Sequence, residues 1–408
     1  MGEGLKMTYV MGASGLGHWV RRLQMTLSER ENQLALRKAV GTKSYAVRRD
    51  ELQRYGIEER NYFSIDPGEP LPDAFFDGLD VVYVASPNEF HKAQTLQALE
   101  KGKVTVTEKA FATTRAEFEE VVREARARGR DRVTLGLHYV TKTLTMELGK
   151  MLPSLVKRYG KVQSVVSTFF EEVRDEDARR AWLFKPENGG VAMDWIHPLS
   201  IISYVMKAER FSLQDCTPYV IQEFYDSVNP TGYHGRFGVK GRHFSQDAVA
   251  VVRVGKGVRE AHKVFKVRLE DAQVELLYIS TDDEFLTGSR GKMVITEKGG
   301  KSTTVSPSGP LSYEFMIDDM LRMLKGGAPM LSLEDITKIY EPEWQIQRGA
   351  GVGEARPQEG RDRRVRLRRP GGQAMTGGPG SAAATRTPAS GGAFLSRRRA
   401  GTVRPPPR

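Results

Sequence analysis

The sequence has almost no cysteine. Cys216 is the single one among 408 residues, so an intrachain disulfide and a zinc site built from cysteines are both excluded. Long apolar runs are also lacking, since none approaches the roughly 20 residues that a membrane-spanning helix needs. Residues 1–6 lead directly into a first strand, so we expect no cleavable signal. These features predict a cytoplasmic protein.

Positive charge is concentrated in one segment. Residues 349–408 hold thirteen arginines, three acidic residues and no lysine, which accounts for ten of the eleven net positive charges. The rest of the chain is nearly neutral, so we expect no nucleic-acid-binding face on it. The segment is rich in Gly, Ala, Pro, Ser and Thr and lacks periodicity, which predicts a disordered tail. Such a tail would bind polyanions weakly, and a non-native extension explains it equally well.

Strand-like and helix-like segments alternate through residues 1–138. Thr114 and Glu117 form a capping-box pattern for one of the helices. The alternation predicts an α/β fold in which a doubly wound parallel sheet forms a Rossmann domain. The expected strands are residues 8–11, 34–40, 80–85, 104–107 and 133–137.

Residues 139–348 have a different pattern, in which strand-like segments follow one another. They predict a second, α+β domain with a largely antiparallel open sheet. The expected helices are residues 141–159, 313–324 and 333–340. The expected strands are residues 162–170, 219–224, 248–254, 263–269 and 272–279.

A glycine-rich turn follows the first strand. Gly12, Ser14, Gly15 and Gly17 occupy the place where dinucleotide-binding proteins keep G-x-G-x-x-G. Glycines allow the tight turn, and the pyrophosphate lies on the following helix N-terminus. Ser14 replaces the second glycine and should narrow the room for the pyrophosphate. Gly15 partly offsets this loss of room. A purely structural turn is the alternative.

The acidic residue that would accept a ribose 2′-OH near the end of the second strand is missing. Thr42, Lys43 and Ser44 stand there instead. A cation beside hydroxyls suits a 2′-phosphate, so we favour NADP over NAD as cofactor. Lys43 as a solvated loop lysine is the alternative.

Two further motifs follow the next strands, at the edge where open α/β sheets bind ligands. The first is Ser86-Pro87-Asn88 with His91, where Asn88 would cap a helix or bond the nicotinamide ribose. His91 suits a buried structural role at least as well. The second is Glu108-Lys109, where the lysine would orient a hydroxyl or carbonyl oxygen beside the nicotinamide.

The run Gly189–Pro198 places a carboxylate and an imidazole close together. In a helix Asp194 and His197 would share one face, and histidine is the usual acid/base near neutral pH. The alternative is a buried helix start with an inert histidine.

In order and spacing these motifs resemble the Gfo/Idh/MocA family of oxidoreductases, over roughly residues 6–345. The resemblance implies a nicotinamide cofactor in the Rossmann domain and a sugar, sugar phosphate or cyclitol over the second sheet, whose exposed face mediates homodimers or homotetramers. It also implies that Lys109 is the lysine of the family's Glu-Lys-Pro motif, that Asp194 positions the substrate, and that His197 is the general acid/base. Position 110 is Ala where the family has Pro, so we expect a different backbone there, because a cis bond is costly without proline.

Further side chains are expected to line the substrate cleft. These are His138, Tyr139, Lys142, Trp182 and Lys185. Together with Arg179 and Arg180, the two lysines would suit a phosphorylated sugar, and the alternative is that these four are solvated charges on a loop and a helix. No metal site is expected. Two other functions stay open: a cofactor-binding sensor or scaffold without the chemistry, and a non-redox relative that cleaves glycosides.

Overall fold

The computed structural model describes six stretches of the chain, and all of them belong to one compact unit. Outside them lie Arg179, Arg180, Trp182, Lys185 and the tail from residue 350 onward. The described stretches are residues 8–28, 33–172, 190–219, 231–258, 261–279 and 289–349. Within them, no helix has the length and apolarity to cross a bilayer.

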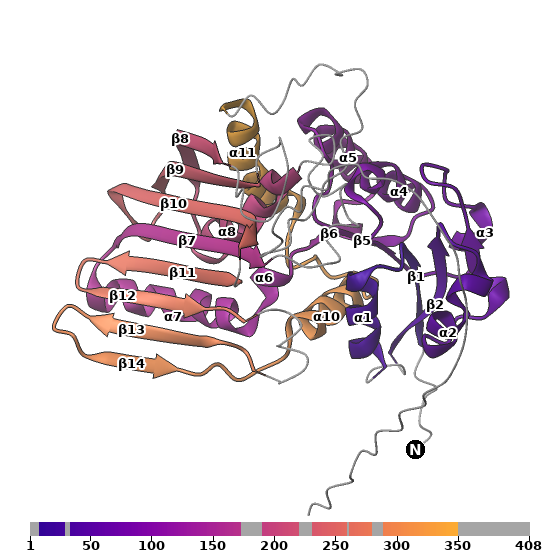
Figure 1. Cartoon of the computed structure of the whole chain (residues 1–408), viewed down its shortest axis with the longest axis horizontal. Coiled ribbons are helices and arrows are strands. Elements are labelled where there is room, and N and C mark those ends of the chain that lie inside the picture. Colours follow the sequence, from indigo (N-terminus) through magenta and orange to yellow (C-terminus); the bar gives the residue numbers. More distant parts are fainter. Residues whose placement is uncertain are drawn as a thin grey trace, which may run out of the picture. The chain divides into compact units, whose positions relative to one another are not determined.

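The first sheet is parallel and has the strand order β3-β2-β1-β4-β5-β6 (Figure 1). This confirms the predicted doubly wound fold. The order reverses between β1 and β4, and ligands of such sheets bind beyond the strand ends at that point. The strands are β1 (Tyr9–Ser14), β2 (Leu34–Gly41), β3 (Tyr62–Ser64), β4 (Val81–Val84), β5 (Val104–Glu108) and β6 (Val133–Gly136). The helices between them are α1 (His18–Leu27), α2 (Tyr45–Arg54), α3 (Asp73–Phe76), α4 (Asn88–Glu100) and α5 (Arg115–Arg128).

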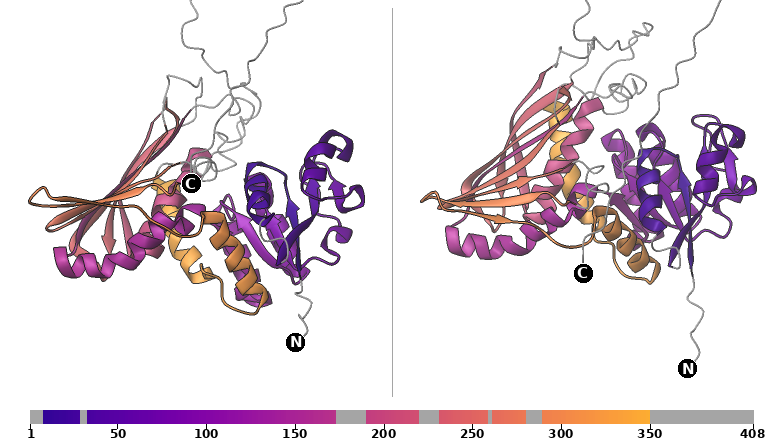
Figure 2. Two further views of the ribbon diagram at one scale, coloured as in Figure 1. Left: turned by 90° about the horizontal axis from the view of Figure 1, so that it is seen from below. Right: turned by 60° about the horizontal axis from the view of Figure 1, so that its bottom comes forward.

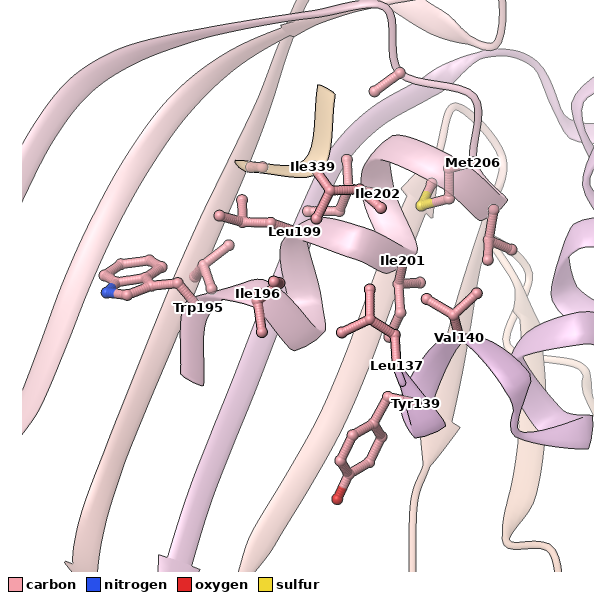
Figure 3. Packing of buried hydrophobic residues seen from close by; sticks show 14 of the residues in the cluster. Leu137, Tyr139, Val140, Trp195, Ile196, Leu199, Ile201, Ile202, Met206 and Ile339 are labelled. Carbon is pink, nitrogen blue, oxygen red and sulfur yellow. The ribbon is translucent and has the colours of Figure 1, made fainter. Parts of the chain in front are cut away.

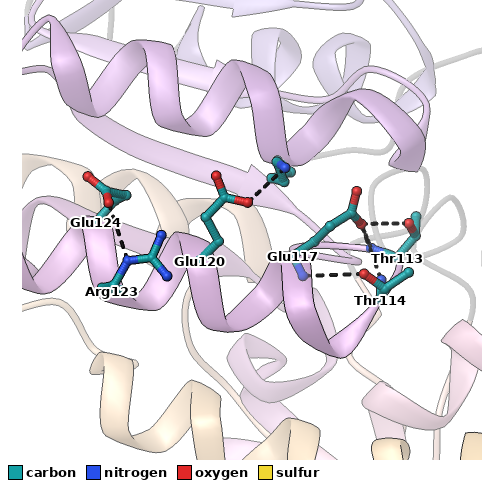
Figure 4. Close-up of polar contacts among 7 residues, drawn as sticks. Thr113, Thr114, Glu117, Glu120, Arg123 and Glu124 are labelled. Atoms are coloured by element: carbon teal, nitrogen blue, oxygen red, sulfur yellow. Dashed lines mark hydrogen bonds and ion pairs between the residues drawn. The ribbon is translucent and has the colours of Figure 1, made fainter.

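The capping box predicted for α5 is present (Figure 4). The backbone N–H of Glu117 donates to the hydroxyl of Thr114 at 3.3 Å, and the Glu117 carboxylate accepts from the backbone N–H of Thr114 at 3.3 Å. The same carboxylate accepts from the hydroxyl of Thr113 at 2.8 Å. These bonds fix the start of the helix, and therefore the end of the loop that follows Lys109.

The second sheet has eight strands in the order β14-β13-β12-β11-β7-β10-β9-β8. Only the β7–β10 pair is parallel, so the predicted, largely antiparallel sheet is confirmed. Four of its strands were not expected, while the expected strand 219–224 lies outside the described residues except for its first position. The strands are β7 (Val162–Glu172), β8 (Arg210–Tyr219), β9 (Gly232–Lys240), β10 (Phe244–Val258), β11 (His262–Leu269), β12 (Ala272–Leu277), β13 (Lys292–Glu297) and β14 (Ser302–Val305).

Helices cover one face of this sheet (Figure 2), and apolar side chains form a core there. In that core, Leu199 and Ile202 pack with Ile339 (Figure 3). The ring of Trp195 is fully buried, and a Cβ at Gly235 of β9 would lie 2.6 Å from it. The helical segments are α6 (His138–Thr141), α7 (Thr143–Tyr159), the 3₁₀ helix η6 (Gly190–Trp195), α8 (Ile196–Ser200), the π-helix η7 (Ile201–Val205) and α11 (Leu333–Gly349).

One late helix completes the core of the first sheet. The helix α10 (Ser312–Leu324) buries Tyr313, Met316 and Met320 in the same apolar cluster as Val20 and Leu23 of α1. The Rossmann core therefore contains residues from two distant parts of the chain.

Candidate active site

The glycine turn leaves open space at the N-terminus of α1. Gly15 has φ +87°, and a Cβ there would lie 2.6 Å from the carbonyl oxygen of Ala85. Gly17 is the N-cap of α1, and no described atom lies within 4 Å of where its Cβ would be. A close backbone approach at Gly15 and an unobstructed helix start at Gly17 are the conditions that a pyrophosphate needs.

Ser14 does not project into that space. Its hydroxyl is buried and donates to Oε1 of Gln94 at 2.5 Å, and the hydroxyl of Ser86 donates to the same oxygen at 2.7 Å. Gln94 thereby ties the turn after β1 to the loop after β4. Ser14 therefore takes less room from the pyrophosphate than expected, because its side chain points into the protein.

The loop after β2 is exposed, as a site for a cofactor ribose requires. Lys43 and Ser44 lie at its surface, and the carbonyl of Lys43 accepts from the hydroxyl of Tyr62 at 2.5 Å. Arg48, which the sequence did not single out, donates from α2 to the carbonyl of Leu16 in the glycine turn at 3.4 Å. Two cations thus border the expected position of the ribose.

His91 links the loops that follow β4 and β5. Its Nδ1 lies 2.6 Å from the carbonyl oxygen of Ala110, and its Nε2 lies 2.7 Å from that of Ser86. Burial lowers the pKa of His91. Both ring nitrogens contact backbone carbonyl oxygens, which supports the structural role. Pro87 precedes α4 as its N-cap, and Asn88 is the first residue of that helix.

Glu108 is the last residue of β5 and Lys109 follows it, and their side chains have different partners. Glu108 is buried, its carboxylate accepts from the hydroxyl of Tyr83, and burial raises its pKa to about 7. The ammonium of Lys109 instead reaches Oδ1 of Asp194 at 2.6 Å. The peptide bond between Lys109 and Ala110 is cis, contrary to our expectation from the missing proline.

Asp194 binds two lysines. Its Oδ1 accepts from Lys109, while its Oδ2 lies 2.9 Å from Nζ of Lys256 on β10. Burial alone would raise the pKa of Asp194, but Lys109 and Lys256 hold it below its usual value. The carboxylate therefore stays ionised between the two ammonium groups.

His197 lies in α8, three positions after Asp194, and is 5% exposed. Burial, followed by Lys109 and Lys263, places its pKa well below the usual value, so the ring is neutral at pH 7. Its Nδ1 has no hydrogen-bond partner among the described residues. A neutral imidazole has a nitrogen lone pair that can accept a proton, while the neighbouring ammonium groups lower its basicity.

The expected cleft residues of α6 surround His197. Its ring centroid lies 4.9 Å from that of His138 and 4.8 Å from that of Tyr139. Nζ of Lys142 lies 5.5 Å from the Tyr139 ring. The structure thus brings Lys109, Asp194, His197 and the α6 residues together, whereas Trp182 and Lys185 lie outside the described residues.

Three charged residues of the second sheet were not predicted. Lys256 contacts Glu171 of β7, and Lys263 of β11 lies 3.2 Å from the same carboxylate. Burial would raise the pKa of Glu171, but the two lysines hold it well below its usual value. The available signal was the strand alternation, since Lys256 continues the buried face of Val252 and Val254. Among the described residues, no cluster of His, Cys, Asp and Glu could hold a metal ion.

Residues 16–136 match the Gfo/Idh/MocA family model, described as an oxidoreductase family with an NAD-binding Rossmann fold. The N-terminal domain belongs to the Gfo/Idh/MocA family. A curated relative is the scyllo-inositol 2-dehydrogenase (NADP(+)) IolU of Bacillus subtilis, 32% identical over 123 residues, which are 29% of this chain and 36% of that protein. The match thus spans about a third of the relative's length.

Solved structures match this chain over both of its sheets. The aldose-aldose oxidoreductase from Caulobacter crescentus, complexed with glycerol, aligns with a TM-score of 0.69 at 19% identity, over 85% of this chain and 99% of that one. The 3-ketoreductase KijD10 from Actinomadura kijaniata, in complex with NADP, aligns with a TM-score of 0.67 at 16% identity, over 84% and 98%. At these identities the likeness establishes the fold.

Proposed function

We propose that this protein is an NADP-preferring oxidoreductase that acts on a carbinol or keto carbon of a sugar, sugar phosphate or cyclitol. The main support is the contact between Lys109 and Asp194, with neutral His197 one helical turn beyond. The contact lies at the strand ends where a Rossmann domain presents its nicotinamide. The inositol dehydrogenase relative, which uses NADP, and the NADP-bound ketoreductase neighbour support this cofactor and substrate class.

The three side chains divide the work of the reaction. When bound, the nicotinamide supplies or accepts the hydride. His197 takes the proton of the substrate hydroxyl when the alcohol is oxidised, and returns it to the oxygen when the ketone is reduced. Lys109 donates a hydrogen bond to that oxygen and stabilises its negative charge. Asp194 holds the Lys109 ammonium in place.

The proposal is tested by nicotinamide absorbance with a panel of polyols and keto-sugars. Wild-type protein should turn over at least one of them, and His197→Ala should lower kcat roughly 10²- to 10⁴-fold. His262→Ala is the matched control, because His262 is an exposed histidine on β11. Cofactor binding without turnover would favour the sensor or scaffold, and release of a chromogenic aglycone would favour the glycosidase.

A further inference from the structure

Five side chains of alternating charge form a continuous chain from the first sheet into the second. Lys109 pairs with Asp194, Asp194 with Lys256, Lys256 with Glu171, and Glu171 with Lys263. The proposed reaction uses only the first pair. The other three members come from neighbouring strands β10, β7 and β11.

Strand register places Lys256 between its two carboxylates. Lys256 of β10 is the direct partner of Glu171 in β7, so the two side chains leave the same face of the sheet side by side. Val252 and Val254 point to the same face and are fully buried. From the sheet, the Lys256 ammonium then reaches Oδ2 of Asp194 in η6 at 2.9 Å.

Stability does not explain a lysine at this position. Lys256 is 8% exposed, and removing two charges from water costs free energy that their attraction only partly returns. Replacing such a buried pair with well-packed apolar side chains is often neutral or stabilising. Although burial would lower the pKa of Lys256, Asp194 and Glu171 raise it above the usual value, so it stays charged.

We propose that Lys256 is a positioning residue for Asp194, an inference that rests on the proposed oxidoreductase function. A carboxylate bound on one oxygen only is free to turn about its last side-chain bond. With Lys256 on Oδ2, Oδ1 is kept on the ammonium of Lys109. Because an ammonium group has three N–H donors, Lys109 then has a fixed orientation and keeps donors for the substrate oxygen.

Glu171 secures Lys256 in turn. Its carboxylate contacts the Lys256 ammonium and lies 3.2 Å from Nζ of Lys263 on the far side. The second sheet therefore contributes to the positions of Lys109 and Asp194 through Lys256, Glu171 and Lys263.

A double-mutant cycle on kcat tests the inference, with Lys256→Met, Asp194→Asn and the two combined. Lys256→Met should lower kcat about 10- to 100-fold, the usual effect of misplacing a catalytic group by about an ångström, with a smaller change in KM. If Lys256 acts through Asp194, the double variant should be no slower than Asp194→Asn. Lys256→Arg, which keeps the charge, should recover most of the loss.

Lys266→Met is the matched control. Lys266 is ion-paired with Glu275 at 3.0 Å on the other face of β11, so its removal should leave kcat unchanged. If Lys256→Met does not fold, Glu171→Gln replaces it, since this change removes the counter-anion and should also lower kcat.

Two results would overturn the inference. One is a double variant whose loss equals the product of the single losses, which would mean that Lys256 acts independently of Asp194. The other is a loss confined to KM, which would make Lys256 a substrate contact. An inactive wild-type protein would instead reject the oxidoreductase function itself, before any variant is compared.

Discussion

Lys109 and Asp194 are 85 positions apart in the sequence, and 2.6 Å separates the ammonium nitrogen of one from a carboxylate oxygen of the other. Lys109 directly follows a strand of the first sheet, whereas Asp194 lies in a 3₁₀ turn against the second. The contact is partly shielded, since the side chains are 17% and 10% exposed. It joins the part of the candidate site that follows the first sheet to the part that lies against the second.

Replacing Lys109 with Met should therefore abolish most turnover. The loss removes both the hydrogen bond to the substrate oxygen and the partner of a buried carboxylate, so kcat should fall about 10²- to 10³-fold, as when one oxyanion-stabilising donor is removed. Lys92→Met is the control, because Lys92 pairs with Glu120 at 2.8 Å on the outer helices. Equal activity of the two variants would contradict the assignment of Lys109.

The pH profile of alcohol oxidation should report His197. Because burial and neighbouring cations hold its pKa well below 6.5, the neutral base is present at pH 7, and kcat/KM should fall only on the acid side as the ring is protonated. Lys263→Met removes one of these cations and should move the acid limb to higher pH. Lys266→Met should leave it in place, and a limb that Lys263→Met does not move would refute this electrostatic coupling. The charged and titratable groups around the ring are Lys109, His138, Tyr139, Glu171, Lys256 and Lys263.

Cofactor choice should depend on the loop after β2. If Lys43 binds the 2′-phosphate, Lys43→Ala should weaken NADP about tenfold and leave NAD nearly unchanged, the equivalent of about 1.4 kcal/mol. Fluorescence titration with both cofactors measures the ratio of the dissociation constants for NADP and NAD. Arg54→Ala is the control, because Arg54 is exposed and lies at the far end of α2, the helix that follows this loop. An unchanged ratio would leave Lys43 as a solvated loop residue.

The two glycines of the turn should respond differently to alanine. Gly15→Ala introduces a Cβ 2.6 Å from a carbonyl oxygen at φ +87°, so it should lower the free energy of unfolding by at least about 1 kcal/mol and impair cofactor binding. Gly17→Ala meets open space and should cost less in stability. Denaturant unfolding, with and without cofactor, compares them. Equal costs would mean that the turn relaxes in solution.

Five of the six strands of the first sheet could be predicted because the signals for them lie in short stretches of sequence, while the three-residue strand β3 was missed. Val81–Val84 is a fully buried strand between clear turn signals, and the capping box of Thr114 and Glu117 is contained in four residues. The strands β8 and β9 were not predicted, because Asp215, Pro218 and several glycines interrupt their patterns. Their strand conformation depends on pairing with each other and with β10, which no short window shows.

The residues of the candidate site likewise include some that the sequence predicts and others that it does not. Lys109, Asp194 and His197 stand in short motifs with recognisable chemistry. Lys256 and Glu171 carry no motif, and their contact depends on the register of two strands whose paired residues are 85 positions apart. His138 and Tyr139 were expected only as cleft residues, and the aromatic cluster that they form with His197 depends on how α6 packs against α8.

The return of α10 to the Rossmann core has a consequence for how the protein can be divided. Because Tyr313, Met316 and Met320 fill space beside α1, a fragment that ends after β6 would expose an apolar surface to water. Neither domain is formed by one continuous segment of the chain, so the two cannot be expressed as separate halves. The chain passes from the first domain to the second and back, so the loss of α10 should weaken both together, and we expect them to unfold as a single cooperative unit.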